Sequence, residues 1–276
     1  MKWFQSIIFG LISGLSDVLP VSSQAHKAIL LKIFGQNSEH PLLRLFIHIA
    51  ILAALYYCCS SQILRLARQL KLSRIPKKKR KRPLDVQVIM EFKLLRMMII
   101  PALLGLLAYN KVSHLGTRLP ITAIFLLLNA VIMFLPTLLP TGNKDARSMS
   151  ALEGLLMGLG GGLSVLPGIS SVGAATAVAS VCGAERTFAL NLTYLMHMVL
   201  TLALIGFDFA AVFATGLATV TGTVLLTYIL AAAAAFGGTW LGVKAMRLLA
   251  VNIGFTAFAL YSVGAALLSF LLYLMV

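Results

Sequence analysis

Two stretches of this sequence repeat one polar phrase: 14-GLSDVLPVSSQAH-26 and 162-GLSVLPGISS-171. Each contains Gly-Leu-Ser, then Leu-Pro, then a pair of serines. Because proline and glycine interrupt helices, each phrase predicts a break in a hydrophobic helical stretch. Inside a bilayer, irregular backbone is tolerated only where it is buried in protein or lines a watery cavity. The repetition therefore predicts two broken, re-entrant segments that come from an internal repeat.

The rest of the chain is dominated by hydrocarbon side chains. Of its 276 residues, 59% are hydrophobic and 11% are charged, with a mean hydropathy of +0.95, whereas a soluble domain has about 25% charged residues. We expect an all-α integral membrane protein, a polytopic helical bundle forming a single membrane domain over residues 1–276. The apolar windows that approach the ~20 residues of a spanning helix are 43–60, 97–109 with its flanks, 119–138, 187–207, 218–238 and 251–275.

The repeat also divides the chain. The first half is predicted at about 1–138 and the second at about 149–276, joined by the Pro- and Gly-containing linker 139–148. Short helices are expected directly before the phrases, at 3–13 and at about 149–160. Four spans between the phrases would leave both opening on one face.

Positive charge is concentrated in one segment. The formal net charge is +15, and ten of the 23 basic residues lie in 65-RLARQLKLSRIPKKKRKRP-83, which contains no acid. A nucleic-acid-binding patch is one interpretation, but no folded domain surrounds this run. We favour a cytoplasmic loop, held there by the positive-inside rule beside anionic lipid head groups. The expected environment is the bilayer, and no nucleic-acid partner is expected.

The phrases also suit a ligand. A helix that begins after each break would direct its N-terminal N–H groups and positive dipole end at the break, which favours an anion such as phosphate. Serine hydroxyls add donors, and glycines let a ligand approach the backbone. The alternative is that both phrases only kink membrane helices. Because the phrase occurs twice, we favour a site in which the two phrases face each other across one cavity.

Ionisable residues inside membrane segments are functional candidates by default. Asp17 lies within the first phrase and His26 follows its serines. A carboxylate, hydroxyls and an imidazole together could activate a nucleophile and protonate a leaving oxygen. The structural alternatives are a helix cap for Asp17 and a simple hydrogen bond for His26.

Four further residues have weaker claims. His48 and His197 lie in apolar spans, where a neutral histidine bonded to a neighbouring helix is the simpler explanation. Lys27 and Arg186 follow the two phrases and could attract phosphate, or could extend toward the membrane interface. We retain His48, Lys27 and Arg186 as auxiliary candidates.

The motifs resemble those of the undecaprenyl-diphosphate phosphatase family, also called bacitracin-resistance proteins. The family's first motif, Glu-Gly-Leu-Thr-Glu-Phe-Leu-Pro-Val-Ser-Ser-x-x-His, is similar to Ser13–His26, and its second, Pro-Gly-x-Ser-Arg-Ser-Gly, to Pro167–Gly173. The weaker matches are LLRLFIHIAILAALYY and GAERTFALNLTYL, in the family order. The resemblance covers most of the chain.

This resemblance implies a bacterial plasma-membrane enzyme that removes the terminal phosphate of undecaprenyl diphosphate, the lipid carrier of cell-wall synthesis. It also implies an inverted repeat, a site facing the outer side, and assistance from a divalent cation such as Mg²⁺ or Ca²⁺. The lipid partner would be a polyprenyl (di)phosphate, and a homodimer is left open.

Three positions depart from the family pattern. The family's two glutamates correspond to Ser13 and Asp17, and its arginine corresponds to Ser171. Serine cannot reproduce the bidentate grip of arginine on phosphate. The residues kept include Ser23, His26 and, before the missing arginine, Ser170.

We therefore predict a phosphatase. In this interpretation Asp17 binds the metal or acts as base, Ser23 is the nucleophile or a phosphate ligand, and His26 is the acid/base. Ser13 is a further auxiliary candidate. The predicted phosphate-binding residues are Ser22, Gly168, Ser170, Ser171 and Gly173. The alternative is a transporter, flippase or binder of a polyprenyl phosphate that hydrolyses nothing, because the charged family positions are Ser13 and Ser171.

Overall fold

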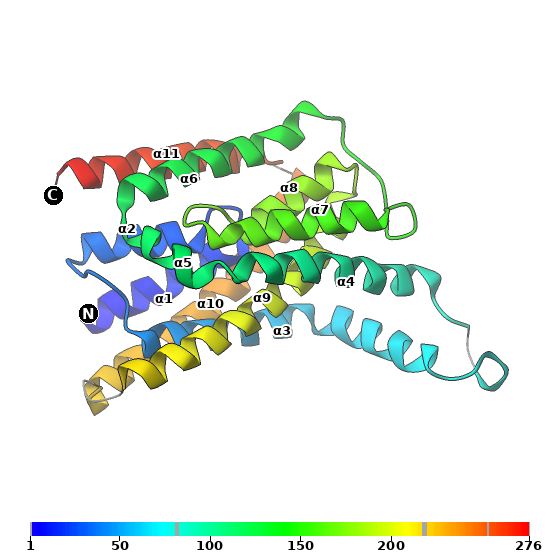
Figure 1. Cartoon of the computed structure of the whole chain (residues 1–276), viewed down its shortest axis with the longest axis horizontal. Helices are drawn as coiled ribbons and strands as arrows, with labels where there is room; N and C mark the ends of the chain where they lie inside the picture. The colour runs from blue at the N-terminus through cyan, green and yellow to red at the C-terminus, as the bar shows by residue number, and fades with distance from the viewer. Residues whose placement is uncertain (1, 81–82, 217–219, 253, 276) are drawn as a thin grey trace.

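The structure, a computed structural model, describes residues 2–80, 83–216, 220–252 and 254–275. These residues form long helices packed side by side, without a β-strand (Figure 1). The α-helices are α1 (Trp3–Val18), α2 (Ser23–Ile33), α3 (Pro41–Ser73), α4 (Val86–Leu106), α5 (Tyr109–Val112), α6 (Leu119–Phe134), α7 (Ala151–Gly162), α8 (Ser171–Val181), α9 (Arg186–Thr215), α10 (Gly222–Asn252) and α11 (Thr256–Leu274). The 3-10 turns are η1 (Lys77–Lys79), η2 (Ser113–Thr117), η3 (Leu135–Leu138) and η4 (Leu163–Val165).

The length and composition of the helices confirm the polytopic membrane prediction. Among the described residues, five segments are long and apolar enough to cross a bilayer: Pro41–Ser73, Leu119–Leu138, Arg186–Thr215, Gly222–Leu249 and Thr256–Leu274. The predicted span at 218–238 begins outside the described residues and continues well beyond its expected end, as α10. The helices α1, α7 and α8 are apolar but shorter.

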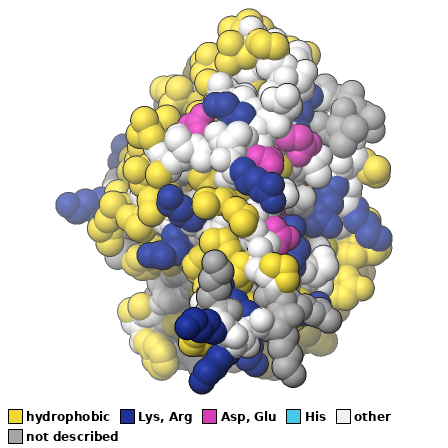
Figure 2. All heavy atoms as spheres, turned by 90° about the vertical axis from the view of Figure 1, so that its right-hand side faces the viewer, with side chains coloured by type: hydrophobic (Ala, Val, Ile, Leu, Met, Phe, Trp, Pro, Cys, Tyr) yellow, Lys and Arg dark blue, Asp and Glu magenta, His cyan; other side chains and the backbone are white. Residues whose placement is uncertain are grey.

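The basic segment differs from the predicted loop. Residues 65–73 continue α3 as helix, so only the part from Arg74 onward leaves it, and residues 81–82 lie outside the described part. Arg65 reaches Glu91 of α4, with 2.5 Å between Nη2 and Oε2. With Glu91, Lys93 and Arg96, α4 carries three charged residues and is not among the five apolar spans, so the span predicted at 97–109 with its flanks is not one of them. Figure 2 shows charged side chains gathered at this end of the bundle.

The two breaks lie between short helices that form hairpins. The first helix extends to Val18, beyond the predicted 3–13, because Gly14 to Asp17 are still helical. The first break is therefore Leu19–Ser22, between α1 and α2. The second follows η4 and reaches Ser170, between α7 and α8. In Figure 1 the open ends of the α1–α2 and α7–α8 hairpins lie at opposite ends of the bundle.

Helix pairs cross between the halves. α1 packs on α10 and α7 packs on α4, while α6 pairs with α11 and α3 with α9. Gly14 of α1 and Gly158 of α7 make the first two contacts close, because a Cβ at either would collide with the partner backbone. Small residues serve this purpose in membrane helix pairs generally. Two halves related by a two-fold axis would give this pairing, and the inversion itself stays a prediction.

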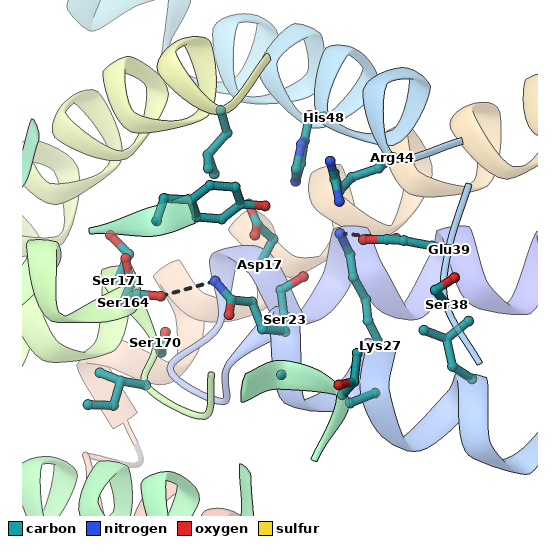
Figure 3. A pocket seen from close by; sticks show the side chains of 18 of the residues that line it. Asp17, Ser23, Lys27, Ser38, Glu39, Arg44, His48, Ser164, Ser170 and Ser171 are labelled. Carbon is teal, nitrogen blue, oxygen red and sulfur yellow. Dashed lines mark hydrogen bonds and ion pairs between the residues drawn. The ribbon is translucent and has the colours of Figure 1, made fainter. Parts of the chain in front are cut away.

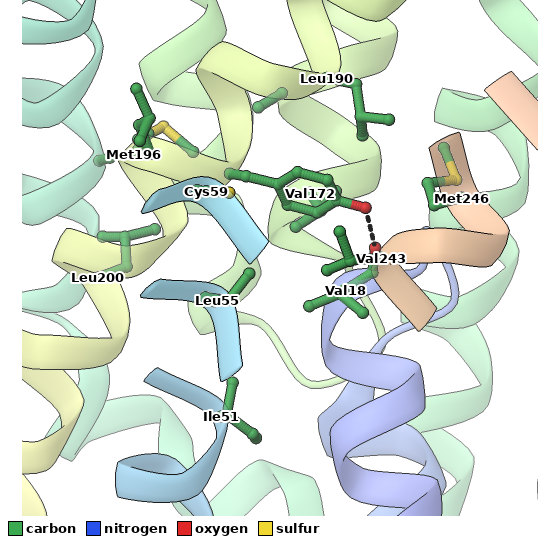
Figure 4. Packing of buried hydrophobic residues seen from close by; sticks show 14 of the residues in the cluster. Val18, Ile51, Leu55, Cys59, Val172, Leu190, Met196, Leu200, Val243 and Met246 are labelled. Atoms are coloured by element: carbon green, nitrogen blue, oxygen red, sulfur yellow. Dashed lines mark hydrogen bonds between the residues drawn. The ribbon is translucent and has the colours of Figure 1, made fainter. Parts of the chain in front are cut away.

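A hydrophobic cluster supports the breaks from behind. Tyr194 of α9 is fully buried in it, and its hydroxyl donates to the Val18 carbonyl at 3.3 Å (Figure 4). Leu55 of α3, Val172 of α8 and Val243 of α10 are also fully buried there. The close packing of these buried side chains holds the end of α1 in one position.

Candidate active site

Direct hydrogen bonds hold the two breaks together. The Ser170 hydroxyl donates to the Leu19 carbonyl at 2.9 Å. Asn129 of α6 bridges the breaks, because its Nδ2 donates to the Pro20 carbonyl at 3.1 Å and its Oδ1 accepts from the Ser170 N–H at 3.0 Å. Gly173 completes the contact, since a Cβ there would lie 2.6 Å from Pro20 Cβ. The two broken segments therefore form one rigid wall.

A cavity of about 290 Å³ opens beside this wall; its lining includes Asp17 and Ser23, which flank the first break, and Ile169 and Ser170 of the second break (Figure 3). Residues of α1, α2, α3 and α9 complete it, together with the segment before α3 and the turn before α6. The lining mixes carboxylates, imidazoles, amines and hydroxyls in an otherwise apolar bundle. Polar groups that converge in a membrane protein mark a substrate path or a reaction site.

An aspartate–histidine pair lies in this cavity. Asp17, in the last turn of α1, accepts a hydrogen bond from or shares a proton with His197 of α9, and Oδ2 lies 2.7 Å from Nε2. Both side chains are largely buried, at 15% and 6% exposure. Their close contact gives the cavity a carboxylate–imidazole pair that can accept and hold a proton.

Serines surround this pair. Ser23, the first residue of α2, lines the cavity and donates to the Ser13 carbonyl at 3.3 Å. Ser170 caps α8 by accepting from the Gly173 N–H at 3.1 Å. The hydroxyl oxygens of Ser13 and Ser171 are buried without a hydrogen-bond partner in the described structure. Ser171 is also one of the residues that line the cavity.

Basic residues occupy another side of the cavity. Lys27 of α2 lines it and pairs with Glu39, with 3.7 Å between Nζ and Oε2. Arg44 and His48 of α3 line it as well, and both contact Asp208 of α9. Figure 3 shows Lys27, Arg44 and His48 directed toward the space beside Asp17.

The other predicted site residues lie outside the lining. Both ring nitrogens of His26 are engaged elsewhere, with Nδ1 2.7 Å from the Ser22 carbonyl and Nε2 2.6 Å from the Tyr261 hydroxyl. Ser22 caps α2 by accepting from the Ala25 N–H. The guanidinium of Arg186 lies over the ring of Phe255.

The two predicted phosphate-binding glycines are packing positions. Gly168 has a φ of +127°, and a Cβ there would lie 2.7 Å from Phe125 Cβ. Gly173 faces Pro20, as described above. Neither belongs to the cavity lining.

The donor set bears on the predicted divalent cation. The described residues contain no group of three or more His, Cys, Asp or Glu side chains arranged to hold a metal. Asp17 supplies one carboxylate to the cavity, and one of its oxygens already contacts His197. Mg²⁺ commonly takes only one or two carboxylates and completes its shell with water and substrate phosphate. The residues therefore fit a cation that arrives with a phosphate ligand.

Several groups at this site were not predicted from the sequence. Neither Arg44 nor Asp208 was identified as a candidate. A signal for the basic pair exists, because Arg44 and His48 are four residues apart and so share one helix face. Nothing local connects them to Asp208, which lies 164 residues from Arg44.

Comparison with known proteins adds a family relationship. A family model described as "Bacitracin resistance protein BacA" matches residues 6–268. The chain is 30% identical to the undecaprenyl-diphosphatase of Thermosipho africanus over 69% of its length and 72% of the relative's. It is 29% identical to that of Treponema denticola over 74% of both chains. It is 24% identical to that of Alkaliphilus metalliredigens over 84% of this chain and 85% of the relative.

Proposed function

Because this chain belongs to the bacitracin resistance protein BacA family, we propose that it hydrolyses undecaprenyl diphosphate to undecaprenyl phosphate and inorganic phosphate. The relatives named above carry the name undecaprenyl-diphosphatase. Hydrolysis would return the lipid carrier to cell-wall synthesis. The substrate class is a polyprenyl diphosphate, whose chain would lie among the apolar helices.

The Asp17–His197 pair carries this proposal. It joins a carboxylate to an imidazole at 2.7 Å in a cavity that lies beside the two breaks. A pair of this kind orients water and accepts its proton. His197 takes the acid/base role that the sequence suggested for His26, because His26 lies outside the cavity lining with both ring nitrogens engaged.

The reaction can be written with these residues. The oxygen of a water held by Asp17 attacks the terminal phosphorus, and its proton passes to the Asp17–His197 pair. The bond from that phosphorus to the bridging oxygen breaks, and undecaprenyl phosphate leaves with the electron pair. Ser23 and Ser171 offer hydroxyl donors to the phosphoryl oxygens. Ser23 is assigned as a ligand because its hydroxyl bonds the Ser13 carbonyl rather than a base.

A divalent cation is part of the proposal as a companion of the substrate. Asp17 would hold it together with oxygens of the diphosphate, and it would neutralise phosphate charge. The residues around it keep their roles: Asp17 and His197 hold the proton, and the breaks orient the phosphate.

The direction of the cavity follows from the charge of α3. Arg44, in the first turns of α3, lines the cavity, whereas the basic segment lies at the far end of the same helix. A helix of 33 residues is about 50 Å long and so crosses the whole bilayer. If the basic end is cytoplasmic in a bacterial plasma membrane, the cavity opens on the outer side.

A second candidate is a non-hydrolytic transporter or binder of a polyprenyl phosphate. The buried, unpartnered hydroxyls of Ser13 and Ser171 favour it, because they stand where the family pattern has charged residues. Such a protein would bind the lipid without releasing phosphate.

Phosphate release by the purified protein in detergent, with Mg²⁺, with Ca²⁺ and with chelator, separates the two candidates. We expect release that depends on the cation and that falls by a factor of about 10³ in Asp17→Asn. Asp145→Asn is the matched control, since Asp145 lies in the linker. Saturable lipid binding without release would overturn hydrolysis and support the second candidate.

A further inference from the structure

A buried carboxylate organises two basic residues at the edge of the cavity. Asp208 of α9 is fully buried. Its Oδ1 accepts from Nε of Arg44, and its Oδ2 lies 2.5 Å from Nδ1 of His48. Because Arg44 and His48 are four residues apart on α3, they present the same face to Asp208. One acid therefore fixes the orientation of both side chains.

This arrangement leaves the outer part of the guanidinium available. Arginine has five N–H donors in a planar fork, and the bond to Asp208 uses the one on Nε. Asp208 is the hydrogen-bond partner of this guanidinium among the described residues. The side chain is 21% exposed and lines the cavity. Its two terminal nitrogens form an edge that matches two phosphate oxygens.

We propose that Arg44 is the phosphate clamp of this site, positioned by Asp208, in place of the arginine that the family pattern has at Ser171. This proposal rests on the proposed function for its substrate, a lipid diphosphate. Arg44 binds the phosphoryl oxygens with its terminal nitrogens, and Asp208 is a positioning residue. Figure 3 shows Arg44 and Ser171 on different sides of the cavity, with Asp17 between them. The proposed clamp therefore lies on the other side of the cavity from Ser171.

Lys27 is the competing cation, and its geometry suits the role less well. Its ammonium pairs with Glu39 at 3.7 Å, and an ammonium acts on phosphate as a point charge. A guanidinium held at Nε has a fixed plane and keeps a bidentate edge. Arg44 thus offers direction as well as charge.

The test measures lipid binding and turnover in the same variants. Binding of radiolabelled undecaprenyl diphosphate and phosphate release would be compared for wild type, Arg44→Gln, Arg44→Lys and the control Arg186→Gln. We expect kcat/KM to fall about 10³-fold in Arg44→Gln, judged from arginines that clamp transferring phosphates. Lipid binding weakens in the same variant. Arg44→Lys retains part of both, and Arg186→Gln is unchanged.

A double variant separates phosphate binding from a purely structural ion pair. Arg44→Gln alone leaves the buried Asp208 with His48 but without its arginine, which destabilises the fold. Arg44→Gln with Asp208→Asn removes both charges, so we expect its melting temperature to recover while binding and turnover stay low. Recovery of binding and turnover in the double variant would overturn the proposal.

The binding measurement keeps this inference independent of hydrolysis. If the wild type binds the lipid but releases no phosphate, hydrolysis fails, and weaker binding in Arg44→Gln still supports the clamp. If the wild type releases phosphate and a folded Arg44→Gln matches it in binding and rate, the clamp fails while hydrolysis stands.

Discussion

The first break places an acid at the end of α1 and a lysine in α2 beside the cavity, whereas the second break contributes hydroxyls and backbone groups. Each break has one residue with positive φ, but it is Gly168 in the second and Ser22, at φ 62°, in the first. Such a conformation costs a non-glycine residue about 1–3 kcal/mol. The charged groups Asp17 and Lys27 thus flank the first break, which also contains the strained residue Ser22.

This difference indicates that the two breaks have different roles in the site. Ser170 of the second break uses its hydroxyl to cap α8 and to bond the Leu19 carbonyl, so it supports the first break. Asp17, at the end of α1 before the first break, contacts His197 of α9. The repeated phrase therefore forms a helix break twice, and only the first copy has an aspartate that contacts a histidine of a distant helix.

The largest expected effect distinguishes the two histidines. His197→Gln should lower turnover by a factor of about 10²–10⁴, because glutamine can contact Asp17 but cannot exchange its proton. His26→Gln should leave the rate nearly unchanged, since His26 faces Tyr261 of α11. Phosphate release from the lipid, with protein amounts matched by gel filtration, measures both. The reverse order of effects would return the acid/base role to the first phrase.

A second prediction breaks the contact between the two phrases. Gly173→Ala places a methyl group 2.6 Å from Pro20 Cβ, and overpacking of this kind typically costs about 1–3 kcal/mol. We expect a lower melting temperature in detergent and weaker lipid binding. Gly264→Ala is the control, because a Cβ there meets nothing within 4 Å. Equal effects in the two variants would mean that helix propensity, not the contact between the breaks, sets the stability.

Much of the fold could be predicted from the sequence, because its causes are local. Hydropathy indicates the spans, and Pro, Gly and Ser indicate both breaks. The end of α1 was placed too early, since Gly14 to Asp17 continue as helix against α10. The basic run was assigned wholly to a loop, although residues 65–73 continue α3 as helix.

The candidate site was less predictable, because the direction in which each side chain points depends on helices that are distant in the sequence. Asp17 and Ser23 belong to the phrase and do line the cavity. Neighbouring residues on a helix point about 100° apart, so with Lys27 toward the cavity, His26 turns toward α11. The contacts of Asp208 and His197 depend on how α9 packs on α1 and α3. No pattern within one helix encodes that packing.

A third prediction tests the neighbouring serines of the second break. Ser170→Ala removes the cap of α8 and the hydrogen bond that joins the two breaks at the Leu19 carbonyl, so stability should fall by about 1–2 kcal/mol. Ser171→Ala removes a hydroxyl that has no partner, so stability should change little while the KM for the lipid rises. Thermal melts and a KM comparison check this pair. A loss of stability in Ser171→Ala alone would contradict the assignment of Ser170 as the structural residue.

The smallest effect concerns the helix that follows the second hairpin. Glu185 caps α9, because its carboxylate accepts from the N–H groups of Thr187 and Phe188 at 2.8 and 2.6 Å. Burial acts to raise the pKa of this carboxyl, but the two backbone hydrogen bonds outweigh it, and the pKa is lowered. A lowered pKa in the folded state means that the cap stabilises above the unfolded value of about 4.3 and is lost as the pH falls through the folded one. The melting temperature of the wild type should therefore decline below that pH, and that of Glu185→Gln should decline less. The cap contributes up to about 1 kcal/mol to the free energy of unfolding. Identical declines would mean that other carboxylates control the acid sensitivity.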